Sequence, residues 1–274
     1  MNIAALLAKS ALSYSSRPAI TWGLETWSDY AGFHRAAGSI GGALKRNYGL
    51  EAGDRVAITM SNRPEFLETL FGIWYAGLVA VPINAKLHPS EFAYVFENSG
   101  ARVCFTAPEL APAIENLRAD TPVLEAVIAA GSDDYKQLCA GAALAYESRA
   151  PEDPAWLFYT SGTTGRPKGA TLSHRNLLVM TLSYFADMDP ISPEDCVLHA
   201  APLSHASGLY GLPHVAKAAN NVIPKSGGFD AEEILALIPH FPGMTLFGAP
   251  TMIVRLMNSP AMAGADTRNL KLLY

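Results

Sequence analysis

The chain has 274 residues, half of them hydrophobic, and a formal net charge of −5 at pH 7. This length suits one large domain or two smaller ones, and the charge implies no polyelectrolyte partner, so we expect a globular protein that does not bind nucleic acid. The apolar stretch 69–85 is interrupted by Gly72, Gly77 and Pro82. It falls short of the roughly 20 apolar residues that span a bilayer, so we interpret it as a buried helix followed by a strand, not as a transmembrane segment.

The N-terminus contains a short apolar run that is broken by Lys9 and has no basic start, which is not typical of a signal peptide. We therefore expect a cytoplasmic protein. Cys104, Cys139 and Cys196 are odd in number, far apart and without metal-ligand spacing. We expect them to be reduced thiols in the core or on the surface.

Short runs of β-branched, aromatic and other apolar residues alternate with longer helical patterns along the chain. The predicted buried strands are 55–60, 80–84, 102–107, 155–160, 196–202 and 244–250. Three helix starts are predicted from capping patterns: Thr26 with Asp29, Asn62 with Pro64 and Glu65, and Asp230 with Glu233. The alternation predicts an α/β fold with parallel-rich sheets layered with helices. The region 108–154, which is rich in Ala, Asp and Glu, is interpreted as a surface excursion or a subdomain boundary.

Residues 159–170 read YTSGTTGRPKGA and concentrate groups that suit phosphate oxygens. Glycines let backbone N–H groups approach an anion closely, the hydroxyls of Ser and Thr add donors, and Lys168 adds a positive charge. Hydrogen bonds to a charged group contribute roughly 1.5 to 3 kcal/mol each, so a handful could hold a triphosphate against water. A flexible linker is the alternative, but strand-like residues on both sides argue against it.

The Walker loop, G-x-x-x-x-G-K-[ST], is the first rival interpretation of this segment. Counting from Gly162 places Lys168 in register. However, Pro167 stands where the second glycine should be, and Gly169 stands where the magnesium-binding hydroxyl should be. A Walker loop also runs directly into a helix, whereas this sequence predicts strand, loop, strand, with the next helix at 176–186.

The segment YTSGTTGRPKGA resembles the phosphate-binding signature of the adenylate-forming superfamily. This superfamily includes acyl-CoA synthetases, aryl-acid CoA ligases, firefly-type luciferases and peptide-synthetase adenylation domains. Residues 53–84, 202–211 and 244–257 resemble other family segments in the same order. Because peptide-synthetase domains usually carry an FDxS-type sequence where this chain has PLSHASG, the acid:CoA ligase branch is favoured.

The resemblance implies that a carboxylate attacks the α-phosphate of ATP, with Mg²⁺ present, and that the acyl group then passes to coenzyme A. The substrate would be a small carboxylic acid. Thr160 would lie near the magnesium ion, and Lys168 would offset the charge of the β and γ phosphates. The residues implied to bind the nucleotide are Thr160, Ser161, Gly162, Thr163, Thr164, Gly165 and Lys168.

His205, in PLSHASG, is the predicted catalytic residue. It follows a predicted strand and precedes a glycine, and the resemblance places it near the substrate carboxylate and the α-phosphate. It would donate a hydrogen bond or orient the acyl group; an ordinary packed histidine is the alternative. The remaining histidines of this region, His174, His199 and His214, are expected to be structural. Four further residues are candidates either for the acid pocket or for the core: Tyr210, Phe247, Thr251 and Met252.

By this resemblance, residues 1–274 correspond to an incomplete large N-terminal domain of an adenylate-forming enzyme. The rest of that domain and the small C-terminal domain would be absent. We therefore expect the chain alone to have little ligase activity and weak ATP affinity. A degenerate nucleotide-binding module and an interaction protein remain as alternatives. The acid could be fatty, aromatic or short and dicarboxylic, and the thiol acceptor stays open. Exposed apolar surface near Tyr274 would favour a homo-oligomer.

Overall fold

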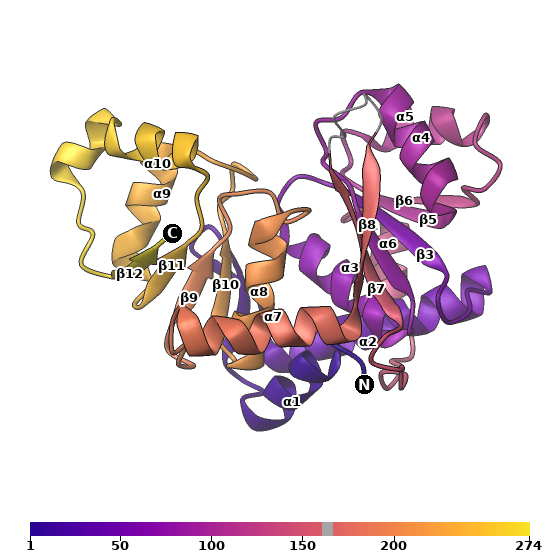
Figure 1. Ribbon diagram of the computed structural model, residues 1–274, viewed down its shortest axis with the longest axis horizontal. Coiled ribbons are helices and arrows are strands. Elements are labelled where there is room, and N and C mark those ends of the chain that lie inside the picture. The colour runs from indigo at the N-terminus through magenta and orange to yellow at the C-terminus, as the bar shows by residue number, and fades with distance from the viewer. Residues whose placement is uncertain (161–166) are drawn as a thin grey trace. The chain divides into compact units, whose positions relative to one another are not determined.

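The computed structural model describes residues 1–160 and 167–274 (Figure 1). By its internal contacts the chain divides into two compact units, which are described separately. Unit 1 consists of Met1–Ala5, His34–Ser61 and Glu65–Leu178; unit 2 consists of Leu6–Phe33, Asn62–Pro64 and Val179–Tyr274.

Unit 1 contains a six-stranded sheet in the order β6-β5-β3-β4-β7-β8. Neighbouring strands are parallel except for β7 and β8, which are antiparallel. The strands are β3 (Arg55–Thr59), β4 (Val79–Pro82), β5 (Ala101–Thr106), β6 (Ala126–Ala129), β7 (Pro154–Thr160) and β8 (Lys168–Ser173).

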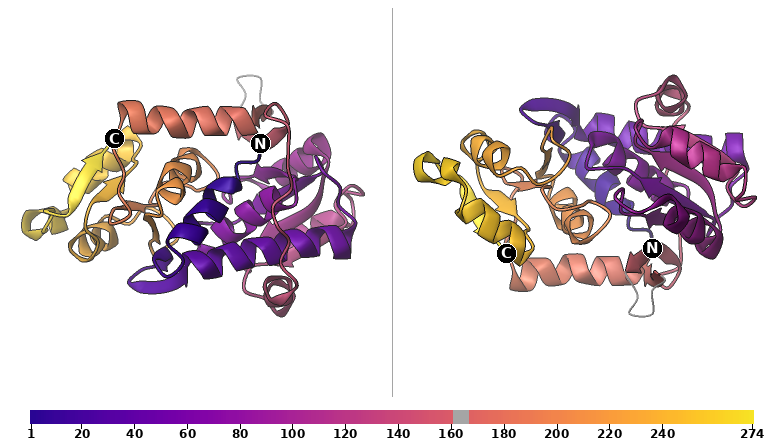
Figure 2. Two further views of the ribbon diagram at one scale, coloured as in Figure 1. Left: turned by 90° about the horizontal axis from the view of Figure 1, so that it is seen from below. Right: turned by 90° about the horizontal axis from the view of Figure 1, so that it is seen from above.

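Helices cover both faces of this sheet, as Figures 1 and 2 show. On one face, α4 and α5 bury Phe92, Phe96 and Ile114 against the sheet. On the other face, Trp74 of α3 packs against Trp156, and Tyr135 of α6 packs against a phenylalanine of β5. The helices are α2 (Tyr30–Tyr48), α3 (Pro64–Tyr75), α4 (Pro89–Ser99), α5 (Ala111–Arg118) and α6 (Asp133–Ala140).

Unit 2 contains a second six-stranded sheet in the order β12-β11-β9-β10-β1-β2, parallel except for the β1–β2 hairpin. Its strands are β1 (Pro18–Trp22), β2 (Glu25–Asp29), β9 (Cys196–Leu198), β10 (Asn220–Ile223), β11 (Met244–Leu246) and β12 (Leu270–Leu273). Its helices are α1 (Ala5–Ser13), α8 (Ala206–Ala216), α9 (Ala231–Leu237), η1 (Ile238–His240), α10 (Pro250–Met257) and η2 (Pro260–Gly264). The residues of α7 (His174–Asp187) are divided between the two units. The first residues of three other helices also fall in the other unit: Ala5 of α1 in unit 1, and 30–33 of α2 and Pro64 of α3 in unit 2.

The predicted fold class is confirmed, because each unit layers helices on a mainly parallel sheet. All six predicted strands are present, and 69–85 does form a buried helix end followed by β4. The predicted start of α9 is also confirmed, since the side chain of Asp230 accepts a hydrogen bond from the Glu233 N–H at 2.9 Å.

Two local predictions were wrong. Thr26 does not cap a helix but lies within β2, where β-branched and aromatic neighbours favour an extended backbone. The helix begins instead after Asp29, whose carboxylate accepts a hydrogen bond from the Gly32 N–H at 2.7 Å. The region 108–154 is neither only a surface excursion nor a boundary, because it contributes α5, β6 and α6 to unit 1, whose segment Glu65–Leu178 runs through it without a break.

No pattern in the sequence indicated β1, β6 or β10. The last two have only four residues each, and β1 depends on a hairpin closed at Gly23, whose φ of 63° favours glycine. Such short strands are stabilised by pairing in the sheet, as where Ile20 of β1 pairs with Asn221 of β10, far away in sequence.

The three cysteines are free thiols, as predicted. Cys104 and Cys196 are buried and Cys139 is partly buried. Burial raises the pKa of each thiol to about 12, which leaves the thiols protonated and unreactive at pH 7.

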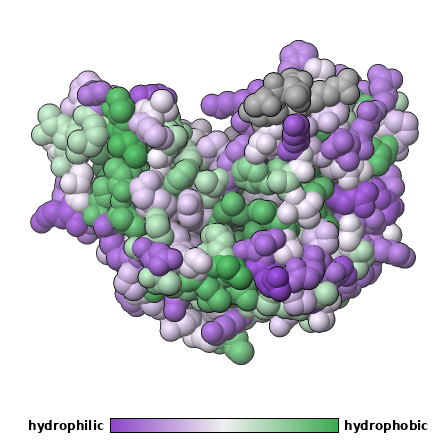
Figure 3. All heavy atoms as spheres, viewed as in Figure 1, coloured by the Kyte–Doolittle hydropathy of each residue, from purple (hydrophilic) through white to green (hydrophobic). Residues whose placement is uncertain are grey.

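Exposed apolar side chains occur on α10 of unit 2, where Val254 and Met257 are 57% and 56% exposed. Figure 3 shows hydrophobic residues on the face of the molecule where Figure 1 draws this helix. The predicted homo-oligomer stays a prediction.

A lysine on the edge strand β12 forms ion pairs with two aspartates elsewhere in unit 2. The ammonium nitrogen of Lys271 lies 2.9 Å from Asp189 Oδ1 and 2.8 Å from Asp195 Oδ2, and both acids are largely buried. Burial by itself would lower the pKa of Lys271, but the hydrogen bonds to the two carboxylates outweigh it, so the pKa is raised. The stabilisation is therefore complete below the ordinary lysine pKa and is lost as the pH rises through the raised value.

Replacing Lys271 by methionine is expected to lower the free energy of unfolding at pH 7 by about 2 kcal/mol, because two neighbouring carboxylates lose their cation. The loss is smaller than for a fully buried ion pair because the lysine side chain is 31% exposed to solvent, which screens the charges. Urea denaturation measures the change, and Lys9→Met, at an exposed position of the same unit, is the control. A loss no larger than that of the control would contradict the expected role of this ion pair.

Candidate functional site

The phosphate-binding signature lies on the β7–β8 hairpin of unit 1. Thr160 is the last residue of β7 and pairs with Lys168, the first residue of β8. Both residues are exposed. The other predicted nucleotide-binding residues, Ser161, Gly162, Thr163, Thr164 and Gly165, lie outside the described residues.

The base of this hairpin is buried and its tip is exposed. Near the base, Ala155 and Trp156 are fully buried, and the Trp74 indole N–H donates to the Ala155 carbonyl at 2.8 Å. Near the tip, Tyr159 pairs across the strands with Gly169. A Cβ atom at Gly169 would come within 3.0 Å of the Tyr159 ring, so glycine leaves room for the tyrosine to lie across its partner strand. A rigid base thus presents the two ends of the signature loop to solvent.

The order strand, loop, strand distinguishes this segment from a Walker loop. β8 begins at Lys168, within the signature, and α7 begins only at His174. The Ser173 hydroxyl accepts a hydrogen bond from the Asn176 N–H at 3.2 Å, as expected for a residue just before a helix. The two predicted strands are therefore confirmed, and the predicted loop falls on residues 161–166, outside the described residues.

His205, the predicted catalytic residue, is the N-cap of α8 in unit 2. Its carbonyl accepts the first helical bond, from the Gly208 N–H at 3.1 Å. The ring is half-buried, and its Nδ1 lies 2.9 Å from the Ser204 hydroxyl. Burial lowers the pKa of His205, so the ring is neutral at pH 7. A neutral imidazole at a helix start is suited to orient a carboxyl group by hydrogen bonding.

The other three histidines of this region are fully buried, which agrees with their predicted structural role. His174 accepts a hydrogen bond from the Ile3 N–H at its Nδ1, 3.1 Å away. His214 Nδ1 lies 2.8 Å from the Tyr210 carbonyl, and the two ring nitrogens of His199 are bonded to Ser207 and Asn221.

The polar contacts of Asn62 were missed by sequence reasoning. Asn62 lies two residues before the first residue of α3 and was assigned to the start of that helix. Instead, its carboxamide bonds to the backbone of residues 199, 201 and 203. No local pattern signals this contact, since the partners are 137 to 141 residues away.

Of the four candidate pocket residues, the structure brings two together. The rings of Tyr210 and Phe247 lie 5.2 Å apart, and both pack against Tyr274 at 5.1 and 5.8 Å. Thr251 is exposed, and Met252 packs into the hydrophobic core below β9 and β11. Tyr210 belongs to α8, the helix that follows His205, and with Phe247 and Tyr274 it forms a partly buried apolar cluster.

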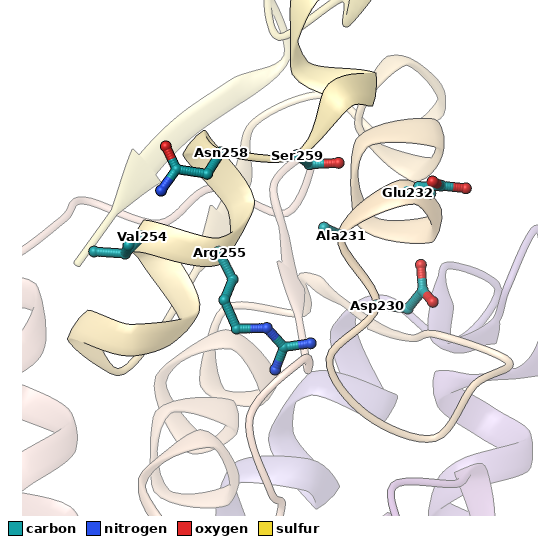
Figure 4. Close-up of a pocket in the computed structure, with 7 residues that line it drawn as sticks. All are labelled: Asp230, Ala231, Glu232, Val254, Arg255, Asn258 and Ser259. Atoms are coloured by element: carbon teal, nitrogen blue, oxygen red, sulfur yellow. The ribbon is translucent and has the colours of Figure 1, made fainter.

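An open groove of about 400 Å³ lies between α9 and α10, and none of the predicted site residues lines it. Figure 4 shows Arg255 reaching into the groove from α10, with Asp230 across from it. The Arg255 guanidinium lies over the Phe229 ring at 4.8 Å, which accounts for the position of the arginine by packing alone. We do not assign the candidate site to this groove.

Comparison with known proteins agrees with the signature and the fold. A model of the AMP-binding enzyme family matches residues 7–274. The chain is 34% identical over 248 residues to a feruloyl-CoA synthase from Amycolatopsis sp., a match that covers 89% of this chain and 48% of that protein. The chain therefore belongs to the AMP-binding enzyme family.

Two solved structures have the same fold. The inhibitor-bound N-terminal domain of FACL13 from Mycobacterium tuberculosis has a TM-score of 0.89 and 25% identity, over 99% of this chain and 69% of that one. ATP-bound MatB from Rhodopseudomonas palustris has a TM-score of 0.86 and 28% identity, over 100% of this chain and 54% of that one.

The chain spans about half the length of the curated relative, at 48%. Within residues 1–160 and 167–274, no helix combines the length and apolar character needed to cross a membrane.

Proposed function

We propose that the protein activates a carboxylic acid with ATP and then transfers the acyl group to coenzyme A. The observation that carries this proposal is the exposed β7–β8 hairpin, which presents Thr160 and Lys168 at the ends of the phosphate-binding signature. The hairpin occurs in a chain that belongs to the AMP-binding enzyme family.

In the first step, a carboxylate oxygen attacks the α-phosphorus of ATP. A new P–O bond forms, the bond to the bridging oxygen of the β-phosphate breaks, and pyrophosphate leaves. In the second step, a thiol sulfur attacks the acyl carbon, AMP leaves, and the thiol proton is lost to solvent. The first step brings two anions together, so the protein must mainly position them and neutralise charge.

The β7–β8 hairpin would supply the groups that position the phosphates and neutralise their charge. The residues proposed to hold the β and γ phosphates are Thr160, Ser161, Gly162, Thr163, Thr164, Gly165 and Lys168. Lys168 contributes a full positive charge at an exposed position, where it can reach a nucleotide from solvent.

Thr160 offers an exposed hydroxyl oxygen, a type of ligand that fits Mg²⁺. The ion prefers oxygen ligands and commonly binds through substrate phosphates, a few waters and one or two protein oxygens. We propose that the Thr160 hydroxyl would lie beside a phosphate-bound Mg²⁺, which would offset negative charge.

His205 is proposed to orient the substrate carboxylate toward the α-phosphate. Its neutral ring can donate one hydrogen bond, and the Ser204 hydroxyl at Nδ1 helps to fix its orientation. The neighbouring Tyr210, Phe247 and Tyr274 would receive an apolar acyl body, which favours a fatty or aromatic acid over a short dicarboxylic one. The similarity to a feruloyl-CoA synthase supports coenzyme A as the acceptor.

Pyrophosphate release by the gene product at its natural length tests this function. With ATP, Mg²⁺ and a panel of aromatic, fatty and short dicarboxylic acids, we expect one class of acid to stimulate release. Adding coenzyme A should then yield a thioester and AMP. His205→Ala is expected to lower kcat by about 100-fold, because the carboxylate loses its orienting group; the exposed His240→Ala is the control. ATP binding without acid-dependent release would instead support a nucleotide-binding module.

A further inference from the structure

The loop that leads to His205 carries buried backbone groups that need partners. β9 ends at Leu198 and α8 begins at Ala206. The His199 N–H still donates to the Val222 carbonyl of β10 at 2.9 Å, but the rest of the loop has left the sheet. Its residues His199, Ala200, Ala201, Leu203 and Ser204 are all buried. A buried backbone N–H or C=O without a partner is costly, so such a loop needs groups that bond to it.

One side chain provides three of these bonds. The Asn62 Nδ2 group donates to the carbonyls of His199 and Ala201, each at 2.8 Å. Its Oδ1 accepts from the Leu203 N–H, also at 2.8 Å. The carboxamide thus holds alternate residues along the loop, and the last of them is two residues before His205.

Asn62 is itself held in place. Its side chain is buried, with 4% of the residue exposed, and its backbone N–H donates to the Gly227 carbonyl at 3.1 Å. Asn62, Gly227 and the loop all belong to unit 2. The contact is therefore a fixed feature of this unit.

A second buried contact holds the other side of His205. His199 Nδ1 lies 2.8 Å from the Ser207 hydroxyl, in the first turn of α8, and His199 Nε2 lies 3.1 Å from Asn221 Oδ1. Because an amide oxygen only accepts, the ring proton is on Nε2, and Nδ1 accepts from Ser207. Ser207 is only 1% exposed, so this arrangement is not a nucleophile with its base. It attaches the start of α8 to β10.

We propose that Asn62 is a positioning residue for His205. It does not touch the substrate; it fixes the loop 199–203, and the contact of His199 with Ser207 fixes the first turn of α8 beyond it. The proposal rests on the proposed role of His205 in acid activation. Where a reacting group is displaced by about 1 Å, the rate can fall by about 100-fold, so the loop must be held tightly.

Hydrogen exchange of the 274-residue chain tests the contact without requiring activity. In Asn62→Ala, the Leu203 amide loses its acceptor, and its exchange is expected to accelerate at least about 10-fold relative to other slowly exchanging amides of unit 2. Asn258→Ala, an exposed asparagine of the same unit, is the control and should leave Leu203 protected. Unchanged protection of Leu203 in Asn62→Ala would overturn the proposal, whether or not the protein has ligase activity.

A double-mutant cycle tests whether the contact acts through His205. In the active gene product, Asn62→Ala is expected to lower kcat about 10- to 100-fold and to leave the KM for ATP unchanged. In a His205→Ala background the same substitution should have little further effect on kcat, because there is no ring left to position. Equal losses in both backgrounds would indicate general destabilisation and would overturn the proposal. An inactive wild-type protein would contradict the proposed function instead. The exchange rate of the Leu203 amide would still show whether Asn62 holds the loop.

Discussion

Lys168→Ala is expected to weaken ATP binding by about 10- to 100-fold, because one hydrogen bond to a charged phosphate contributes roughly 1.5 to 3 kcal/mol. Lys168 is exposed at the first position of β8, opposite Thr160, so its removal should not disturb the buried base of the hairpin. Titration calorimetry of the chain with ATP and Mg²⁺ measures the change.

AMP distinguishes a phosphate contact from a general loss of the site. AMP lacks the β and γ phosphates, so Lys168→Ala should weaken AMP binding far less than ATP binding. Lys168→Arg keeps the charge and should retain most of the affinity, and Lys136→Ala, which removes an exposed lysine from α6 of the same unit, is the control. Equal losses for ATP and AMP would contradict the proposed contact with the outer phosphates.

Stability is expected to fall steeply between about pH 6.5 and pH 4. Burial lowers the pKa of His174 and His199 to about 4 and that of His214 to about 3, against an ordinary value of 6.5. Above pH 6.5 these rings are neutral in both states and contribute no pH dependence. Below it the unfolded chain takes up protons that the folded chain excludes, so each histidine lowers the free energy of unfolding by about 1.4 kcal/mol per pH unit.

The three histidines together should lower the free energy of unfolding by about 4 kcal/mol per pH unit in this range, a large part of the 5–15 kcal/mol typical of a folded domain. Urea denaturation at pH 7, 6 and 5 measures the slope. His199→Gln should flatten the slope by about a third, and Asn258→Gln, which removes no ionisable group from an exposed position, should leave it unchanged. A slope in His199→Gln equal to that of the wild type would show that this ring does not exclude the proton.

Much of the fold follows from patterns within short segments. The six predicted strands are short runs rich in apolar, β-branched and aromatic residues, and the start of α9 is marked by an Asp and a Glu three residues apart. In these segments local propensity and burial favour the same structure. Thr26 shows the limit of such reasoning: its spacing from Asp29 resembles a cap, but pairing with β1 places it in a strand.

The family and its phosphate-binding segment could be read from the sequence alone, because YTSGTTGRPKGA carries its chemistry in twelve consecutive residues. The histidine before α8 could also be singled out, since its neighbours form a second local motif. What holds this histidine could not be predicted. Asn62 reads as part of a helix start, and only tertiary structure brings its carboxamide to a loop more than 130 residues away. Hydrogen bonds to a distant backbone leave no periodicity in sequence, because any residue can supply the backbone groups they use.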